Sequence, residues 1–388
     1  METYVEPSDF ASASWVFGVS DYTFLSNSKI AIGKSGQGVG AFILVDNTFS
    51  EAKRLTLKYS DISYVKGNGD LICFVGAGPL ISPEVVVLNI ATADITVLQK
   101  SNPAVIDQDF ISEPFEISFD SSENGQAHGF YYPPKNAMFS APKNEKPPLL
   151  VKTHGGPTGS ATTNLDLSIQ FWTSRGFAVV DVNYRGSTGY GREFRNLLRG
   201  KWGVYDSDDC ISAAKYLAKK GFVDENRLII RGSSAGGYTT INALTFHNLF
   251  ATGAAYYGIA DLNVFLGETH KFESRYLDSL VGPYPEFKDL YLKRSAINFA
   301  DKLNSPMIIF QGLEDKIVPP SQAEIMVDAL NENGIMHAYI PFEAEQHGFR
   351  IAKNIEYALE VELSFYGKVL GFTPSGKFPD FEIKHEVS

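Results

Sequence analysis

Short apolar segments separated by turn sequences make up the first hundred or so residues of the chain. Turn-forming residues gather at Gly33–Gly36, Asp46-Asn47 and Gly67–Asp70, and no segment between them has helical spacing. The pattern predicts strands at Lys29–Ile32, Ala41–Asp46, Arg54–Leu57, Ile62–Val65, Leu71–Val75, Val85–Asn89 and Ile95–Leu98. They form two groups of about four strands, near residues 15–57 and 58–101, which is the size of two blades of a β-propeller. A small irregular sheet is the alternative interpretation.

From about residue 110 the pattern changes, and apolar strands alternate with helices. The predicted strands are Phe115–Phe119, His128–Tyr132, Leu149–Thr153, Phe177–Asn183, Arg227–Ile230, Ala251–Tyr257, Met307–Gln311 and His337–Phe342. The predicted helices are Asp206–Lys220, Ala235–His247, Ser321–Glu332 and Ile351–Val369. Such alternation predicts an α/β domain, in which helices cover both faces of a mostly parallel sheet. We therefore expect an all-β segment over residues 1–105 and an α/β domain over residues 106–388.

Composition narrows the class of protein. Hydrophobic residues make up 44% and charged residues 20% of the 388 residues, as in soluble globular proteins. The formal net charge of −11 argues against a nucleic-acid partner, because surfaces that bind nucleic acid carry basic patches. The two cysteines, Cys73 and Cys210, predict no disulfide framework, and no clustered cysteine and histidine spacing predicts a metal site.

Nothing in the sequence predicts a targeting or membrane segment. The N-terminus, Met1–Pro7, lacks the basic start and apolar core of a signal peptide and the Arg-rich character of a transit peptide. No apolar run approaches the length of about 18 residues that spans a bilayer. We expect a soluble cytoplasmic protein that uses neither a membrane nor a cofactor.

A candidate nucleophile lies between a predicted strand and a predicted helix. The segment Gly232-Ser-Ser-Ala-Gly236 is a G-x-S-x-G motif, in which small residues permit a sharp turn and the central serine points outward from a strained elbow. The central serine is Ser234, and we expect the adjacent Ser233 to be structural. A turn of small residues in a non-catalytic α/β domain is the alternative interpretation.

A serine nucleophile needs a base and an acid, which follow it in the order serine, acid, histidine in this fold. His347 follows the last predicted strand and precedes the closing helix, where the base is expected. Asp315 follows the strand Met307–Gln311 and is the preferred acid, with Glu314 as the reserve and Asp261 as a more distant candidate. The other histidines after the serine, which lie elsewhere in the pattern, are His247, His270, His337 and His385.

Two backbone amides must also face the oxygen of a developing oxyanion. One is the N–H of Ala235, directly after the nucleophile, and the other is expected from the loop His154-Gly-Gly-Pro157, with Gly156 as the preferred donor. His154 is expected to support this loop rather than act as a base. Tyr256 and Tyr257 are tentative substrate-binding residues and Phe265 is a further pocket-lining candidate, and each fits a place in the core at least as well.

Five segments together resemble the prolyl-oligopeptidase family of serine peptidases, especially its acylaminoacyl-peptidase-like branch. They occur in the family's order over residues 115–370 and are His154–Pro157, Asn183–Gly191, Gly232–Tyr238, Gln311–Val318 and Glu345–Phe349. The resemblance implies an α/β-hydrolase domain preceded by a β-propeller of seven or eight blades, and it implies that Arg185 organises the site through an ion pair. Only about two blades of sequence precede the hydrolase domain, so we expect either a shortened propeller or a different packing of these strands.

The expected function is hydrolysis of acylated or short peptides through an acyl-enzyme, by Ser234, Asp315 and His347 as a catalytic triad. The expected type of peptide cleavage is that of an acylaminoacyl-peptidase, a dipeptidyl-peptidase or an oligopeptidase. Ester hydrolysis by a carboxylesterase with the same triad is the first alternative. A catalytically silent binding protein is the second.

Overall fold

The computed structural model describes residues 8–12, 16–26, 29–46, 48, 52–102, 106–268, 271 and 273–386. Met1–Pro7, on which the targeting prediction rests, lies outside these residues, as do His270 and residue 47 of one predicted turn. Within the part of the chain that the structure describes, no helix combines the length and the apolar character needed to cross a membrane.

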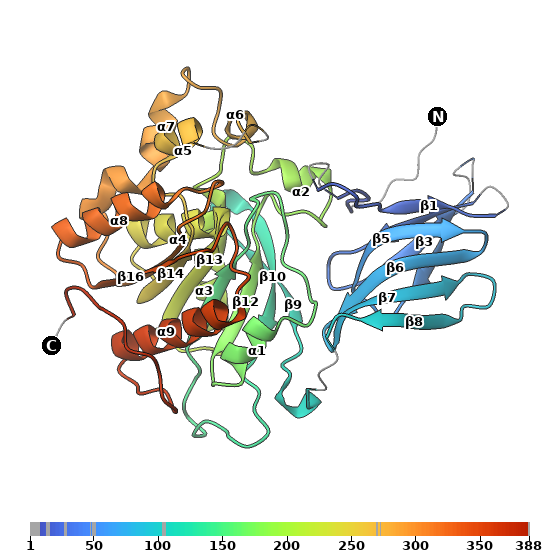
Figure 1. Cartoon of the computed structure of the whole chain (residues 1–388), viewed down its shortest axis with the longest axis horizontal. Coiled ribbons are helices and arrows are strands. Elements are labelled where there is room, and N and C mark those ends of the chain that lie inside the picture. The colour runs from blue at the N-terminus through green and yellow to red at the C-terminus, as the bar shows by residue number, and fades with distance from the viewer. Residues whose placement is uncertain are drawn as a thin grey trace.

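Two four-stranded antiparallel sheets form the N-terminal part and lie side by side at one end of the molecule (Figure 1). In each sheet the strands pair in chain order, as in a blade of a propeller. The first sheet contains β1 (Tyr22–Phe24), β2 (Ile30–Lys34), β3 (Ala41–Val45) and β4 (Ala52–Thr56). The second contains β5 (Asp61–Asn68), β6 (Leu71–Gly78), β7 (Ile81–Asn89) and β8 (Ile95–Lys100). Phe42, Tyr59 and Phe74 pack between the two sheets in one apolar cluster.

An eight-stranded sheet forms the centre of the C-terminal part, in the order β16-β15-β14-β13-β11-β12-β10-β9. Its strands are β9 (Phe115–Asp120), β10 (Gln126–Tyr132), β11 (Leu149–Thr153), β12 (Ala178–Asn183), β13 (Leu228–Ser233), β14 (Thr252–Tyr256), β15 (Met307–Gly312) and β16 (His337–Phe342). β10 pairs antiparallel with both β9 and β12, and the pairs from β12 to β16 are parallel. The carboxyl ends of these parallel strands therefore meet at one edge, where α/β folds bind their ligands.

Helices cover both faces of this sheet. On one face, α3 (Tyr205–Lys219), α4 (Ala235–Phe246) and α8 (Pro320–Glu332) share an apolar cluster with the strands. On the other face, α1 (Leu167–Thr173) and α9 (Ala352–Leu370) share a second cluster. Short helices complete the fold: α2 (Arg192–Asn196), α5 (Leu262–Glu268), α6 (Tyr276–Leu280) and α7 (Lys288–Arg294), with 3₁₀ turns at Gln108–Phe110, Ser122–Asn124 and Ala296–Lys302. The C-terminal part has the α/β-hydrolase fold.

The N-terminal sheets contact the hydrolase domain through the loop that follows the His154-Gly-Gly-Pro157 segment. The Leu165 N–H donates to the Gly78 carbonyl at 2.9 Å, and the Thr163 hydroxyl lies 2.7 Å from the Ser60 hydroxyl. The Asp9 carboxylate accepts hydrogen bonds from the N–H groups of Gly189 and Gly191. Asp9, which precedes β1, thus contacts the loop over residues 183–191, and the N-terminal part lies beside this loop of the hydrolase domain.

Candidate active site

Ser234 occupies a strained turn between β13 and α4. Its backbone has φ 56° and ψ −123°, a conformation that non-glycine residues rarely adopt and that is found at nucleophile elbows. A Cβ atom at Gly232 would lie 2.4 Å from the Gly236 carbonyl oxygen, and one at Gly236 would lie 2.3 Å from the Thr153 carbonyl oxygen. Because a side chain at either glycine would collide with backbone, the motif permits the close approach of helix and strands that exposes the serine.

The structure brings Ser234, His347 and Asp315 into one chain of hydrogen bonds. His347 Nε2 lies 2.8 Å from Ser234 Oγ, and His347 Nδ1 lies 2.7 Å from Asp315 Oδ2. A carboxylate accepts hydrogen bonds, so Nδ1 carries the imidazole proton and Nε2 is left to accept from the serine hydroxyl. The other oxygen, Asp315 Oδ1, accepts from the N–H groups of Ile317 at 2.8 Å and Val318 at 3.0 Å. The Asp315 side chain is fully buried, and its orientation is thereby fixed.

The rival candidates lie in other environments. Ser233 lines a hollow that α9 bounds, together with Tyr257. The side chain of Glu314, the reserve acid, is exposed. Asp261 accepts from the Asn263 N–H at 2.7 Å at the start of α5. These positions give each residue a structural explanation that does not involve Ser234.

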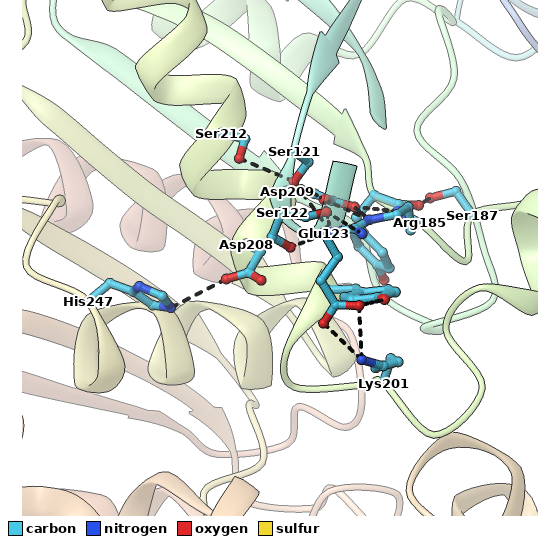
Figure 2. A network of polar contacts seen from close by, with 12 residues as sticks. Ser121, Ser122, Glu123, Arg185, Ser187, Lys201, Asp208, Asp209, Ser212 and His247 are labelled. Atoms are coloured by element: carbon cyan, nitrogen blue, oxygen red, sulfur yellow. Dashed lines mark hydrogen bonds and ion pairs between the residues drawn. The ribbon is translucent and has the colours of Figure 1, made fainter. Parts of the chain in front are cut away.

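The other described histidines also have partners of their own. His247 contacts Asp208 (Figure 2), and its Nε2 atom lies 3.8 Å from the Asp208 carboxylate. The Nδ1 atom of His337 is 2.8 Å from the Ile335 carbonyl oxygen, and the ring of His385 packs near the His337 ring. His347 is therefore the histidine that the fold places at the serine.

Gly156 and Ala235 line the same small pocket as Ser234. Ala235 is the first residue of α4, so its N–H has no carbonyl acceptor within the helix. Gly156 has φ 124°, which favours glycine, and a Cβ atom on the neighbouring Gly155 would lie 3.5 Å from Ser234 Cβ. Both proposed oxyanion donors thus lie in the immediate surroundings of the nucleophile.

His154 supports the loop that carries Gly156. A carbonyl oxygen only accepts, so His154 Nδ1–H donates to the Gly155 oxygen at 2.8 Å. His154 Nε2 lies 2.7 Å from the Ser187 hydroxyl, which donates to the Tyr184 carbonyl oxygen. The ring stacks on Tyr184, and burial lowers the pKa of His154 to about 4, which keeps the imidazole neutral. The Gly155 carbonyl and the Gly156 N–H belong to one planar peptide unit. The hydrogen bond from His154 therefore also orients the Gly156 N–H.

Arg185 holds the loop that contributes Ser187, and Figure 2 shows its network. Its guanidinium Nη2 lies 2.8 Å from Asp209 Oδ1, and its own backbone N–H donates to Asp209 Oδ2 at 2.7 Å. It also donates to the carbonyl and the hydroxyl of Ser122. The guanidinium lies 3.6 Å from the centre of the Tyr205 ring. The Arg185 and Asp209 side chains are 2% and 0% exposed, so this is a buried, fully paired charge.

We expect Arg185→Ala to lower the free energy of unfolding by about 3–5 kcal/mol, because it leaves the Asp209 carboxylate buried without its cation. Urea unfolding followed by tryptophan fluorescence measures this. The matched control is Lys201→Ala, which removes the exposed ion pair between Lys201 and Glu123 in the same network. Equal, small losses for both variants would contradict the assignment of Arg185 as the organising ion pair.

The pocket at Ser234 also contains residues that sequence reasoning did not identify. Its lining residues are Gly156, Pro157, Trp202, Ser234, Ala235, Ile259, Phe265, Glu273, Tyr276, Leu277, Ile317 and Val318. Trp202 precedes α3, Glu273 lies between α5 and α6, and Tyr276 is the first residue of α6. No local motif marks these positions, because Trp202 reaches the pocket from the connection between β12 and β13, and Glu273 and Tyr276 reach it from the long connection between β14 and β15.

Tyr256 and Tyr257, the tentative substrate-binding residues, line a different hollow that α9 bounds. The Tyr256 hydroxyl lies 2.5 Å from Glu362 Oε2 of α9, and its ring stacks on Phe310 inside the core. The Tyr257 ring packs edge-on against the His347 ring, with 4.8 Å between centroids. The Tyr256 ring thus packs in the core and the Tyr257 ring packs beside His347, and a role of either residue in substrate binding stays a prediction.

Metal-binding side chains do not gather in the described parts of the chain. Among the described residues, no group of three or more histidine, cysteine, aspartate or glutamate side chains is arranged to hold a metal ion. Cys73 and Cys210 are both free cysteines, and Cys210 is buried.

The strained serine after β13, the histidine after β16 and the buried aspartate after β15 define an α/β-hydrolase with a serine–histidine–aspartate site. The model of the prolyl oligopeptidase family matches residues 163–373, which is more than half of the 388 residues. The chain belongs to the prolyl oligopeptidase family.

Individual relatives agree with this membership. A puromycin-hydrolyzing peptidase from Mycobacterium tuberculosis has 38% sequence identity and a TM-score of 0.93, over 98% of this chain and 58% of that chain. Dipeptidyl aminopeptidase BIII from Pseudoxanthomonas mexicana is 32% identical over 58% of this chain and 33% of its own length. Acylamino-acid-releasing enzyme 1 from Oryza sativa subsp. japonica is 28% identical over 60% of this chain and 31% of its own length. The chain thus spans about a third of the length of these curated relatives.

Proposed function

We propose that this protein is a serine peptidase that cleaves short or acylated peptides, and related aminoacyl amides, through an acyl-enzyme intermediate. The observation that carries the proposal is the hydrogen-bonded chain from Ser234 through His347 to Asp315. Each link has hydrogen-bond geometry, and the acid is buried and oriented by two backbone amides.

In the acylation step, Ser234 Oγ attacks the scissile carbonyl carbon while His347 Nε2 takes the hydroxyl proton. The carbonyl oxygen becomes an oxyanion and accepts hydrogen bonds from the N–H groups of Gly156 and Ala235. The imidazolium then gives its proton to the leaving amine as the carbon–nitrogen bond breaks. The Asp315 carboxylate stabilises the imidazolium without taking its proton.

In the deacylation step, water takes the place of the amine. His347 Nε2 accepts a proton from the water as its oxygen attacks the ester carbon, and the same two amides bind the oxyanion again. Collapse of this intermediate returns the proton to Ser234 Oγ and releases the acid. His154 and Ser187 act as positioning residues in both steps, because they hold the peptide unit that presents the Gly156 N–H.

The substrate class rests on the relatives. Their names describe a puromycin-hydrolyzing peptidase, a dipeptidyl aminopeptidase and an acylamino-acid-releasing enzyme. Each name implies cleavage of an amide beside one or a few amino acids, which is the chemistry proposed for this chain. A peptide rather than a nucleic acid or a membrane is therefore the proposed partner.

The proposal extends to domain organisation and location. We propose that residues 1–105 form a partial β-propeller of two blades and that residues 106–388 form the catalytic domain. The apolar cluster of the N-terminal sheets draws its members from residues 25–90, and the two hydrolase clusters draw theirs from residue 117 onward, which supports this division. The free state of both cysteines supports a reducing, cytoplasmic location.

A comparison of amide and ester substrates tests the proposed function. We expect the protein to hydrolyse the p-nitroanilides of acetyl-alanine and acetyl-phenylalanine as well as the matching methyl esters, because the imidazolium can protonate an amine leaving group. Release of p-nitroaniline and of acid is measured under the same conditions. Hydrolysis of the esters alone would favour a carboxylesterase, and hydrolysis of neither would favour the silent binding protein.

A further inference from the structure

The hollow that α9 bounds is separate from the pocket at Ser234. Tyr256 and Ala358 in its walls belong to the apolar cluster that α1 and α9 share on one face of the sheet (Figure 1). Trp202 and Phe265 of the Ser234 pocket belong to the cluster on the other face. The hollow has a volume of about 250 Å³, whereas pockets for drug-sized ligands measure about 300–1,000 Å³. A ligand somewhat smaller than a drug-sized molecule therefore fits there.

The charged side chains that line the hollow, among the residues that the structure describes, are both cations. They are Lys152 of β11 and Arg231 of β13. Lys152 Nζ lies 2.7 Å from Asp181 Oδ2 and 3.3 Å from Asp166 Oδ2. These two carboxylates do not line the hollow. A ligand in the hollow therefore contacts the cations and not their acidic partners.

Arg231 keeps hydrogen-bonding capacity for such a ligand. Its ion pair with the buried Glu362 of α9 joins Nε to Oε1 at 3.1 Å. The same carboxylate also accepts from the hydroxyls of Tyr256 at 2.5 Å and Tyr366 at 2.7 Å. A guanidinium has five N–H donors in a planar fork, which is more than a carboxylate shared with two tyrosines satisfies. The Arg231 side chain is 11% exposed, so its remaining donors are held in a mostly dry environment.

We propose that this hollow binds a small carboxylate that carries a short apolar chain. The guanidinium of Arg231 donates to the carboxylate, and the chain lies against Ile355 and Leu359 of α9, which line the same space. Hydrogen bonds between a guanidinium and a carboxylate are stronger than those between neutral groups. The aromatic and aliphatic walls keep water away and strengthen the attraction between the two charges.

The hollow shares part of its wall with the surroundings of the proposed catalytic base. Tyr257 and Phe349 both line it. The Tyr257 ring packs against the His347 ring, with 4.8 Å between centroids, and against the Phe349 ring, with 5.4 Å between centroids. A carboxylate bound in the hollow therefore lies one side chain away from His347.

The carboxylate can come from two sources. It can be an acylated amino acid, which the reaction proposed at Ser234 releases, or a free short-chain acid. Both present a carboxylate and an aliphatic chain to Arg231 and α9. Acetyl-leucine represents the first source and hexanoate the second. Only the attribution to a reaction product rests on the proposed function; the site itself does not.

The experiment measures binding of hexanoate and acetyl-leucine by isothermal titration calorimetry to the wild-type protein and to Ile355→Glu. Ile355 is 41% exposed, so the variant is expected to fold and to place a negative charge at the edge of the hollow. We expect one carboxylate per chain on the wild-type protein and at least about tenfold weaker binding to Ile355→Glu, because like charges repel at short range. Replacement of Arg231 itself would leave Glu362 buried without its cation and endanger the fold.

Lys353→Gln is the matched control, because it changes the net charge of α9 by the same amount at an exposed position that does not line the hollow. Its affinity for the acids is expected to stay within about twofold of the wild-type value. Hexylamine has the same chain with the opposite charge and is expected not to bind.

Binding of acetyl-leucine that Ile355→Glu weakens identifies a reaction product as a ligand, and such binding of hexanoate alone identifies a free acid. The inference is overturned if neither acid binds, if hexylamine binds as well as hexanoate, or if Ile355→Glu weakens binding no more than Lys353→Gln does. Calorimetry of these acids requires no turnover. Failure of the protein to hydrolyse amides would therefore overturn the proposed function and leave the carboxylate site in place.

Discussion

Replacement of Ser234 by alanine is expected to lower kcat for peptide amides by about 10⁴-fold or more. The substitution removes the oxygen that forms the acyl-enzyme, and the two backbone amides alone leave only a weak residual rate. The fold is expected to remain intact, because the strained backbone at this position is set by Gly232, Gly236 and the surrounding strands. Steady-state hydrolysis of acetyl-phenylalanine p-nitroanilide measures the loss, and thermal melting checks the fold.

Ser233→Ala is the matched control, since it removes a hydroxyl one residue away. Ser233 lines one hollow with Tyr257, whose ring packs against His347, so loss of the Ser233 hydroxyl is expected to reduce kcat by less than about tenfold. If Ser233→Ala abolished turnover while Ser234→Ala retained it, the assignment of the nucleophile within the motif would be wrong.

Asp315→Asn is expected to lower kcat by about 10⁴-fold at neutral pH with little change in fold. An asparagine amide can donate to His347 Nδ1, which places the imidazole proton on Nε2. That tautomer can no longer accept the proton of Ser234. The asparagine also carries no charge to stabilise the imidazolium. The measurement is kcat on the same amide substrate, with circular dichroism to compare the folds.

The control for this variant is Glu314→Gln, at the neighbouring carboxylate. Glu314 has an exposed side chain, and its backbone N–H donates to the Glu345 carbonyl, a contact that the substitution preserves. Turnover is expected to remain close to that of the wild-type protein. A large loss for Glu314→Gln together with a small loss for Asp315→Asn would show that the reserve carboxylate is the acid.

The sequence predicted the alternation of strands and helices well, because buried parallel strands produce continuous apolar runs. The bounds of Leu149–Thr153 and His337–Phe342 are the same in the prediction and in the structure. The two N-terminal sheets were also recognisable, since turn residues separate their strands. The fold class and the family are confirmed by the structure and the comparisons.

Other elements were not predictable from local pattern. Strand β1 has only three residues with exposed ends, and α2, α5 and α6 are helices of five to seven residues. Such short helices do not show a full amphipathic period, and tertiary contacts hold them in place. The pocket residues Trp202, Glu273 and Tyr276 come from these regions, so their convergence on Ser234 depends on three-dimensional folding alone.

Local motifs predicted Ser234, Asp315 and His347, which the structure links by hydrogen bonds, because the loops that carry them have strict sequence requirements. A sharp turn needs glycine, and the order of the loops after successive strands is fixed by the fold. The tentative role of Tyr256 in substrate binding stays a prediction, because the face to which a strand residue points depends on register rather than on a local motif. In the structure, that register directs the Tyr256 hydroxyl to Glu362 on α9.

Labelling with a fluorophosphonate probe tests the central claim that His347 and Asp315 activate Ser234. A fluorophosphonate phosphonylates a serine only when a base activates its hydroxyl. Intact-mass spectrometry followed by peptide mapping is expected to show one adduct per chain, on Ser234, and none in folded Asp315→Asn over the same time. Folded wild-type protein that remains unlabelled, or that is labelled on a different serine, would contradict the account.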